Sequence, residues 1–256
     1  MKVLGVYFSG TGNTRHCVET FVDLCGYSRS YKSIESKDVL SALANHDDIV
    51  LGYPIYYSNA PKIMQDFVTE HGHLFSGKKV FILCTMAMWS GDGSGCMARK
   101  LTKLGATIVG GLHLRMPDSI ADEKVLKKDD AGNRTIIAKA DVKLADAASK
   151  YIAGSPPKDG LGFPAHLAGL LGQRLWFYGK TTSYKRAPKV NKEKCFGCRC
   201  CSELCPMQNI ELVDKKAVSH DRCTLCYRCV NHCPAQALTI LGKKIHSPYS
   251  YARYEP

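Results

Sequence analysis

Regularly spaced cysteines are the residues of this sequence with the clearest potential for chemistry. The chain has 256 residues and 13 cysteines, and eight of the cysteines form a pattern that occurs twice. Soft thiolate ligands favour iron–sulfur clusters or zinc, and zinc normally takes paired C-x-x-C units from separated segments. Here each unit has three cysteines at steps of three and a fourth directly before a proline. The units are Cys195, Cys198, Cys201 and Cys205 before Pro206, and Cys223, Cys226, Cys229 and Cys233 before Pro234.

The duplicated pattern predicts two [4Fe–4S] clusters rather than zinc or a set of structural disulfides. Three cysteines at steps of three surround one cluster, and the cysteine before the proline ligates the cluster of the other unit. Cluster I is expected to be held by Cys195, Cys198, Cys201 and Cys233, and cluster II by Cys223, Cys226, Cys229 and Cys205. Cys200 lies outside the pattern. This half of the chain resembles the bacterial two-cluster ferredoxins over nearly its whole length, which implies that it carries single electrons.

A glycine-containing loop near the N-terminus is the second candidate site. Its glycines allow a tight turn in which backbone N–H groups converge on an anion at a helix N-terminus. It is not a Walker loop, since no Lys-Ser or Lys-Thr pair follows, and Arg15 replaces the third glycine of a dinucleotide fingerprint. The loop therefore predicts a phosphate site without magnesium. The expected ligands are Ser9, Gly10, Thr11, Gly12, Asn13 and Thr14.

The glycine loop resembles the flavodoxin loop that holds the phosphate of FMN, and the whole chain resembles the flavodoxin–ferredoxin fusion proteins. The resemblance implies FMN at the switch point beyond strands one and three, with the isoalloxazine ring between two further loops at residues 53–61 and 86–95. The alternative for the aromatic residues of these loops is that they only cover the core. The expected contacts are Pro54, Tyr56, Tyr57, Ser58, Asn59, Met88, Trp89, Ser90, Gly91, Asp92 and Gly93. No catalytic acid or base is singled out.

The elements that position these residues alternate between strand and helix patterns. Short apolar runs predict strands, and apolar residues at helical spacing predict the helices between them. The expected fold is α/β, a flavodoxin-like doubly wound sheet of five parallel strands in the order 2-1-3-4-5. A small α+β ferredoxin-like domain with two clusters follows it. The expected strands cover residues 2–8, 27–34, 48–53, 79–85 and 107–114.

The sequence divides into four segments by composition. Residues 1–153 form the expected FMN domain and residues 193–242 the expected cluster domain. Residues 154–192 are rich in Pro, Gly and aromatic residues and read as a strap between the domains, with partner docking as the alternative. Residues 243–256 form a tail with basic residues and tyrosines, which suits either partner contact or a mobile end.

The composition indicates the compartment in which the protein is located and the kinds of partner it binds. The N-terminus does not match a signal peptide, and no apolar run is long enough to insert into a membrane, so we expect a cytoplasmic protein whose cysteines are reduced. The formal net charge is +12, which the anionic clusters and the FMN phosphate reduce to about +6. No nucleic-acid motif accompanies this charge. The expected partners are redox proteins. The excess of basic residues distinguishes this chain from flavodoxins, which are strongly acidic.

Three functions fit these observations. The leading hypothesis is an electron-transfer protein that relays single electrons between FMN and two [4Fe–4S] clusters, connecting ferredoxin-type donors to a redox partner. The first alternative is an FMN-dependent reductase of a small organic substrate that is fed through the clusters. The second alternative is a dedicated electron-delivery or activator subunit of one partner enzyme.

Overall fold

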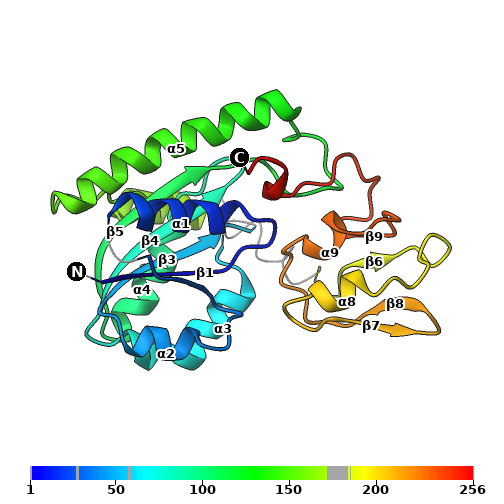
Figure 1. The fold of residues 1–256 in the computed structure, drawn as a ribbon, viewed down its shortest axis with the longest axis horizontal. Helices are drawn as coiled ribbons and strands as arrows, with labels where there is room; N and C mark the ends of the chain where they lie inside the picture. The colour runs from blue at the N-terminus through cyan, green and yellow to red at the C-terminus, as the bar shows by residue number, and fades with distance from the viewer. Residues whose placement is uncertain (1, 27–28, 57–58, 172–183, 185, 256) are drawn as a thin grey trace.

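The computed structural model describes the chain except residues 1, 27–28, 57–58, 172–183, 185 and 256. A larger α/β body, blue to green, lies beside a smaller body, yellow to orange (Figure 1). The larger body contains the glycine loop, and the smaller body contains both cysteine units. None of the described helices combines the length and the hydropathy that crossing a membrane requires.

A parallel sheet forms the centre of the larger body. Its strands pair in the order β2-β1-β3-β4-β5, and every pairing is parallel. This is the expected order, so the expected fold class is confirmed. The strands are β1 (Val3–Tyr7), β2 (Tyr31–Ser33), β3 (Asp48–Pro54), β4 (Lys79–Met86) and β5 (Thr107–Arg115).

Helices cover both faces of the sheet. One face packs against α1 (Asn13–Leu24) and α5 (Asp130–Ile152). The other face packs against α2 (Val39–Ala44), α3 (Lys62–His71), the 3-10 turn η1 (Gly72–Phe75) and α4 (Gly93–Lys103). In β3, Val50 packs in the core on the side of α1 and α5, whereas Ile49 and Leu51 pack in the core on the opposite side of the sheet. Burial of both faces explains why the strand sequences are continuously apolar.

Helix α5 begins within a strongly charged part of the sequence. Residues 123–134 have the composition of a charged, solvated loop, yet the last part of this stretch is helical from Asp130. The Asp129 side chain caps this helix by accepting a hydrogen bond of 2.8 Å from the backbone N–H of Gly132. The remaining loop, residues 116–128, therefore connects β5 to α5 at the carboxyl end of the sheet.

The smaller body has little regular structure of its own. Two short antiparallel pairs are formed by β6 (Lys189–Val190) with β9 (Leu238–Thr239), and by β7 (Ile210–Val213) with β8 (Lys216–Ser219). Its helices are α8 (Cys200–Leu204) and α9 (Arg228–Asn231). Several cysteines of the two units lie in its small core, where a larger protein would place aliphatic side chains.

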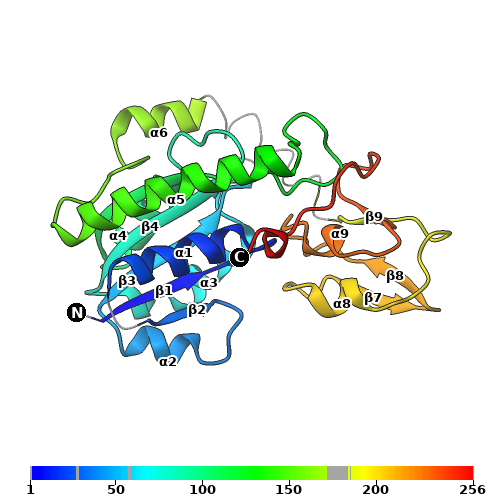
Figure 2. The same ribbon diagram turned by 45° about the horizontal axis from the view of Figure 1, so that its top comes forward.

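Two segments outside these elements pack on the larger body. Residues 157–160 run along β5, where Gly111 donates to the Pro157 carbonyl and accepts from the Asp159 N–H, both at 2.8 Å. Helix α6 (Phe163–Gly169) follows and contacts α4. The C-terminal segment, residues 246–255 with η3 (Tyr251–Arg253), returns to α1 and α5 (Figure 2).

Candidate functional site

A pocket of about 660 Å³ lies at the carboxyl ends of β1, β3, β4 and β5. Crevices of this position in open α/β sheets bind ligands. The pocket wall comes from the glycine loop, the ends of β3 and β4, the loop after β5 and the second cysteine unit. These residues are Ser9, Gly10, Thr11, Asn13, Thr14, Pro54, Ile55, Tyr56, Thr85, Met86, Ala87, Met116, Pro117, Asp118, Ser119, Ile120, Leu225 and Tyr227.

The glycine loop has the conformation that an anion site requires. Gly12 has a φ of 100° and precedes the first residue of α1, and its N–H donates to the Ser9 hydroxyl at 3.1 Å. A Cβ at Gly12 would lie 2.6 Å from the Cβ of Tyr251, so a larger residue would displace the C-terminal segment. The first turn of α1 thus reaches the pocket wall, where its N–H groups lack intrahelical acceptors. This geometry fits a phosphate-bearing flavin.

Two side chains of the glycine loop are engaged with protein groups. The Asn13 amide nitrogen donates to the Pro117 carbonyl at 2.9 Å, and the Tyr249 hydroxyl donates to the Asn13 amide oxygen at 2.6 Å. The hydroxyls of Thr14 and Thr85 are hydrogen-bonded at 2.7 Å. These contacts join the loop to β4, to the loop after β5 and to the C-terminal segment.

The two loops that were expected around the flavin ring, after β3 and after β4, differ in whether they reach the pocket. Pro54 and Tyr56 line the pocket, and Tyr56 and Asn59 exchange backbone hydrogen bonds of 2.9 and 3.1 Å. Tyr57 and Ser58, also expected there, lie outside the described residues. Asn59 does not appear among the described residues of the pocket wall. Among the described residues, the end of β3 and the loop after it reach the site through Pro54, Ile55 and Tyr56.

The loop after β4 turns from the pocket toward α6. None of Met88, Trp89, Ser90, Gly91, Asp92 and Gly93 is among the described residues of the wall. Met88 and Trp89 are 62% and 57% exposed. Asp92 is buried and accepts hydrogen bonds from Arg99 at 2.7 Å and shares a 2.9 Å hydrogen bond with His166 of α6. The role of these six residues as ring contacts stays a prediction.

The sequence reasoning missed the loop after β5. Residues 116–120 form a continuous part of the pocket wall. The available signal was their position after a parallel strand, because ligands bind beyond the carboxyl ends of such strands. Asp118 is the acidic residue of this wall, and burial raises its pKa while Lys127 opposes the shift. Burial lowers the pKa of Lys127, and Asp118 opposes that shift.

The eight patterned cysteines lie around two separate cavities of the smaller body. The first cavity, of about 330 Å³, is lined by Cys195, Cys198, Cys201 and Cys233. The second, of about 310 Å³, is lined by Cys205, Cys223, Cys226 and Cys229. The two groups of four are those expected from the crossed pattern, and their role as cluster ligands stays a prediction. Cys200 also borders the first cavity, but its thiol donates to the His232 carbonyl at 3.4 Å.

Backbone groups surround the patterned thiols. The Cys205 and Cys233 sulfurs each accept a backbone N–H at 3.3 Å, from Asn209 and Ala237. Such N–H···S bonds stabilise thiolate ligands and tune cluster potentials. Burial raises the pKa of Cys226 to about 11, and a coordinated metal would favour the thiolate form of such a sulfur. The described residues contain no set of three His, Cys, Asp or Glu arranged for a single metal ion. The donor set fits clusters.

Arg228 of α9 connects the second cysteine unit to the glycine loop. Its guanidinium donates to both Glu35 carboxylate oxygens at 2.7 and 2.8 Å and to the Ser9 carbonyl at 2.8 Å. It also donates to the Leu204 carbonyl, next to Cys205, at 3.2 Å. The Arg228 side chain thus bonds both to the glycine loop and to the peptide group that borders the second cavity.

Asp122 makes a second connection between the two bodies. This fully buried carboxylate accepts the Tyr227 hydroxyl at 2.8 Å and the backbone N–H groups of Ile240 and Leu241 at 2.9 and 2.7 Å. Gly10 makes the closest backbone approach, since a Cβ there would overlap the carbonyl oxygen of Cys226. The second cavity is therefore the one whose cysteine unit touches the pocket at the carboxyl end of the sheet.

Comparison with known proteins identifies two domains. The family model of the flavodoxin domain matches residues 4–110, and that of the 4Fe-4S binding domain matches residues 215–238. Flavodoxin from Megasphaera elsdenii is 29% identical over 127 residues, which cover 47% of this chain and 92% of that protein.

Two solved structures illustrate the structural comparison. The solution structure of two-electron reduced Megasphaera elsdenii flavodoxin has 24% identity and a TM-score of 0.42, covering 58% of this chain and 98% of that one. A flavodoxin from the domain Archaea has 19% identity and a TM-score of 0.39, covering 58% and 99%. The strand order and the domain match carry the assignment of the fold.

Proposed function

We propose that this chain relays single electrons between FMN and two [4Fe–4S] clusters, and that it connects ferredoxin-type donors to a redox partner. A flavodoxin domain and a 4Fe-4S domain in one chain make it an electron-transfer flavoprotein with iron–sulfur chemistry. When bound, FMN accepts electrons singly or in pairs and each cluster exchanges one. The number of clusters and the direction of transfer belong to the proposal.

One observation carries the relay. Leu225 and Tyr227, which alternate with Cys226 in the second cysteine unit, line the same pocket as the glycine loop. Cys223, Cys226 and Cys229 with Cys205 would hold cluster II directly behind this wall. The other four cysteines would hold cluster I, and Cys198 is exposed to solvent there. This arrangement supports entry of electrons at cluster I and delivery to FMN from cluster II.

The domain boundaries are also part of this proposal. Residues 1–153 hold FMN, 193–242 hold the clusters and 154–192 form the strap. The contacts of residues 157–160 with β5 and of α6 with the loop at Asp92 support a strap that packs on the flavodoxin half. The aromatic residues at 176–178, considered for partner docking, lie outside the described residues.

Rapid-mixing kinetics test the relay. An acidic bacterial ferredoxin, reduced beforehand, is mixed anaerobically with the full chain, and flavin absorbance is followed. We expect Cys229→Ala, which disturbs cluster II, to slow flavin reduction severely, and Cys198→Ala, which disturbs cluster I, to slow it as well. Cys25→Ala, a buried cysteine outside both cavities, is the control. Equal rates in all four proteins would show that electrons reach FMN without the clusters.

A further inference from the structure

The flavin pocket contains one carboxyl group, that of Asp118. The other titratable side chains of the described wall are the phenols of Tyr56 and Tyr227. Burial, with Cys226 nearby, holds the pKa of Tyr56 well above its usual range, and the Tyr227 hydroxyl donates to Asp122. Neither phenol is therefore suited to exchange protons near neutral pH. Asp118 is only 8% exposed, so its charge state matters to whatever binds beside it.

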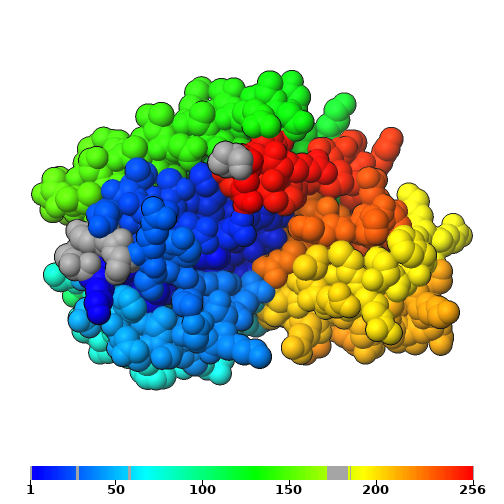
Figure 3. Space-filling view, viewed as in Figure 1, coloured from blue at the N-terminus to red at the C-terminus, as the bar shows by residue number. Residues whose placement is uncertain are grey.

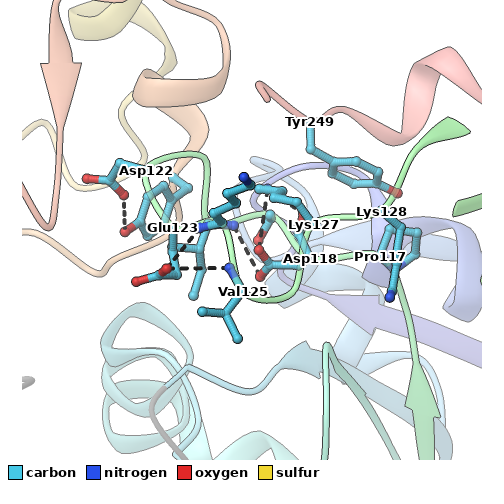
Figure 4. Close-up of polar contacts among 12 residues, drawn as sticks. Pro117, Asp118, Asp122, Glu123, Val125, Lys127, Lys128 and Tyr249 are labelled. Atoms are coloured by element: carbon cyan, nitrogen blue, oxygen red, sulfur yellow. Dashed lines mark hydrogen bonds and ion pairs between the residues drawn. The ribbon is translucent and has the colours of Figure 1, made fainter. Parts of the chain in front are cut away.

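The two oxygens of Asp118 differ in their bonding. Oδ1 accepts the backbone N–H of Ile120 at 3.3 Å. Oδ2 is buried and accepts no hydrogen bond from the described residues. The Lys127 ammonium lies 3.3 Å from Oδ2, an ion-pair distance, but directs its hydrogen bond to the Asp118 carbonyl at 2.9 Å (Figure 4). Buried polar atoms of proteins nearly always have a hydrogen-bond partner, so the open lone pairs of Oδ2 point to a ligand.

The surroundings of Asp118 favour a carboxyl group that can hold a proton. Burial raises its pKa, Lys127 lowers it in part, and Glu123 of the same loop raises it further. From the other walls, Tyr56 and Tyr227 face the pocket as neutral phenols, and Asp122 is occupied by three donors. A raised pKa keeps the group protonated at pH values where an exposed aspartate is ionised.

We propose that Asp118 exchanges, through Oδ2, the proton that accompanies reduction of bound FMN. This inference rests on the proposed function. Cluster II supplies electrons without protons, whereas full reduction of FMN takes up two electrons and at least one proton. The electrons come from the external reductant by way of the clusters, and the proton comes from the Asp118 carboxylic acid. Asp118 is left as a carboxylate, which the Lys127 ammonium stabilises until a proton from water restores the acid.

The test compares Asp118→Asn with wild type in the intact, FMN-loaded protein. Asparagine retains an oxygen for the Ile120 N–H but cannot exchange a proton. Glu123→Gln, a neutralised carboxylate of the same loop outside the pocket wall, is the matched control. Two properties are measured over a pH series: the rate of flavin reduction by dithionite in H₂O and D₂O, and the midpoint potential of the flavin. Affinity for FMN is determined by fluorescence titration.

We expect Asp118→Asn to reduce the rate about 100-fold, to remove its decline with rising pH and to diminish the solvent isotope effect. The midpoint potential should lose the bend that marks ionisation of Asp118. Glu123→Gln should keep the rate, the isotope effect and the bend, with the bend at lower pH because Glu123 helps to raise the pKa of Asp118. Unchanged kinetics and potential in Asp118→Asn would overturn the proposal, and so would loss of FMN binding, which would make Asp118 a binding residue. If dithionite reveals the Asp118 effect but ferredoxin reduces FMN equally well without clusters, only the relay is wrong.

Discussion

At the scale of single residues, the glycine loop divides its side chains between two tasks. Asn13 and Thr14 bond to other parts of the protein. The Thr11 hydroxyl makes no hydrogen bond within the part of the chain that the structure describes, although Thr11 lines the pocket. We therefore expect the Thr11 hydroxyl to bind the FMN phosphate and Asn13 to fix the shape of the loop.

This division predicts different effects for two alanine variants. Thr11→Ala should weaken FMN binding by about 1–3 kcal/mol and leave the stability of the flavin-free protein unchanged, because only a phosphate donor is lost. Asn13→Ala should also lower the free energy of unfolding by about 1–3 kcal/mol, because the Pro117 carbonyl and the Tyr249 hydroxyl lose their buried partner. Fluorescence titration with FMN and urea unfolding measure both. Thr11→Ser, which retains the hydroxyl, is the control, and equal destabilisation by both alanine variants would contradict the assignment.

At the scale of elements, two short helices link the cavities. Helix α8 carries Cys201 at the first cavity, and Cys205 at its C-terminal end reaches the second. Helix α9 carries Cys229 at the second cavity, and Cys233 shortly after it reaches the first. Each cysteine unit thus contributes three thiols to one cavity and one to the other. The two clusters are expected to depend on each other structurally.

The crossing predicts which cluster each cysteine supports. Cys205→Ala should damage the cluster associated with Cys223, Cys226 and Cys229, since its sulfur borders their cavity. Cys200→Ala should leave the iron content unchanged, since this thiol donates to a carbonyl group. Iron and sulfide analysis with low-temperature EPR of the reduced proteins distinguishes the two clusters. Loss of the cluster at Cys195 in Cys205→Ala, or loss of iron in Cys200→Ala, would refute the ligand sets.

At the scale of the whole molecule, the C-terminal segment holds the two bodies together. It leaves the smaller body and lies on the larger one, where Figure 3 shows it in red against α1. Tyr249, Tyr251 and Tyr254 are buried in the core between α1 and α5. The Tyr251 ring stacks on His16 with a centroid distance of 4.4 Å, and its N–H donates to the Thr11 carbonyl at 2.8 Å. The segment thus packs within the protein itself, a role that differs from both partner contact and a mobile end.

Removing one of these rings should therefore affect stability and flavin binding together. We expect Tyr251→Ala to lower the free energy of unfolding by about 3 kcal/mol, as for other large buried aromatic residues. Affinity for FMN should also fall, because Tyr251 packs against Gly12 of the phosphate loop. Urea unfolding and FMN titration provide the measurements, with Arg253→Ala, an exposed change in the same segment, as the control. If Tyr251→Ala matched the control, the segment would not be part of the site.

The features that the sequence determined are encoded in local patterns. The spacing of the cysteines predicted the two groups of four thiols. A chain that passes closely around a cavity can place three cysteines at steps of three beside it, while the cysteine before the proline reaches the other cavity. Apolar runs and helical periodicity indicated five buried strands alternating with helices, since both faces of a parallel sheet must be buried. The resemblance to flavodoxin implied the order of these strands. The glycine loop was recognisable because Gly10 and Gly12, with several hydroxyl residues, directly follow the first predicted strand.

Only the tertiary structure decided which distant segments meet at the pocket. Asp118 lies between β5 and the charged stretch at residues 123–134, and no sequence pattern marked it as a pocket residue. Its burial depends on tertiary contacts, including the ion pair with Lys127. The packing of the loop at Asp92 against α6, and of Tyr251 against Gly12, joins segments far apart along the chain. Such contacts leave no periodic pattern in the sequence. They depend on how the side chains of distant elements pack together and on which buried polar groups then need a hydrogen-bond partner.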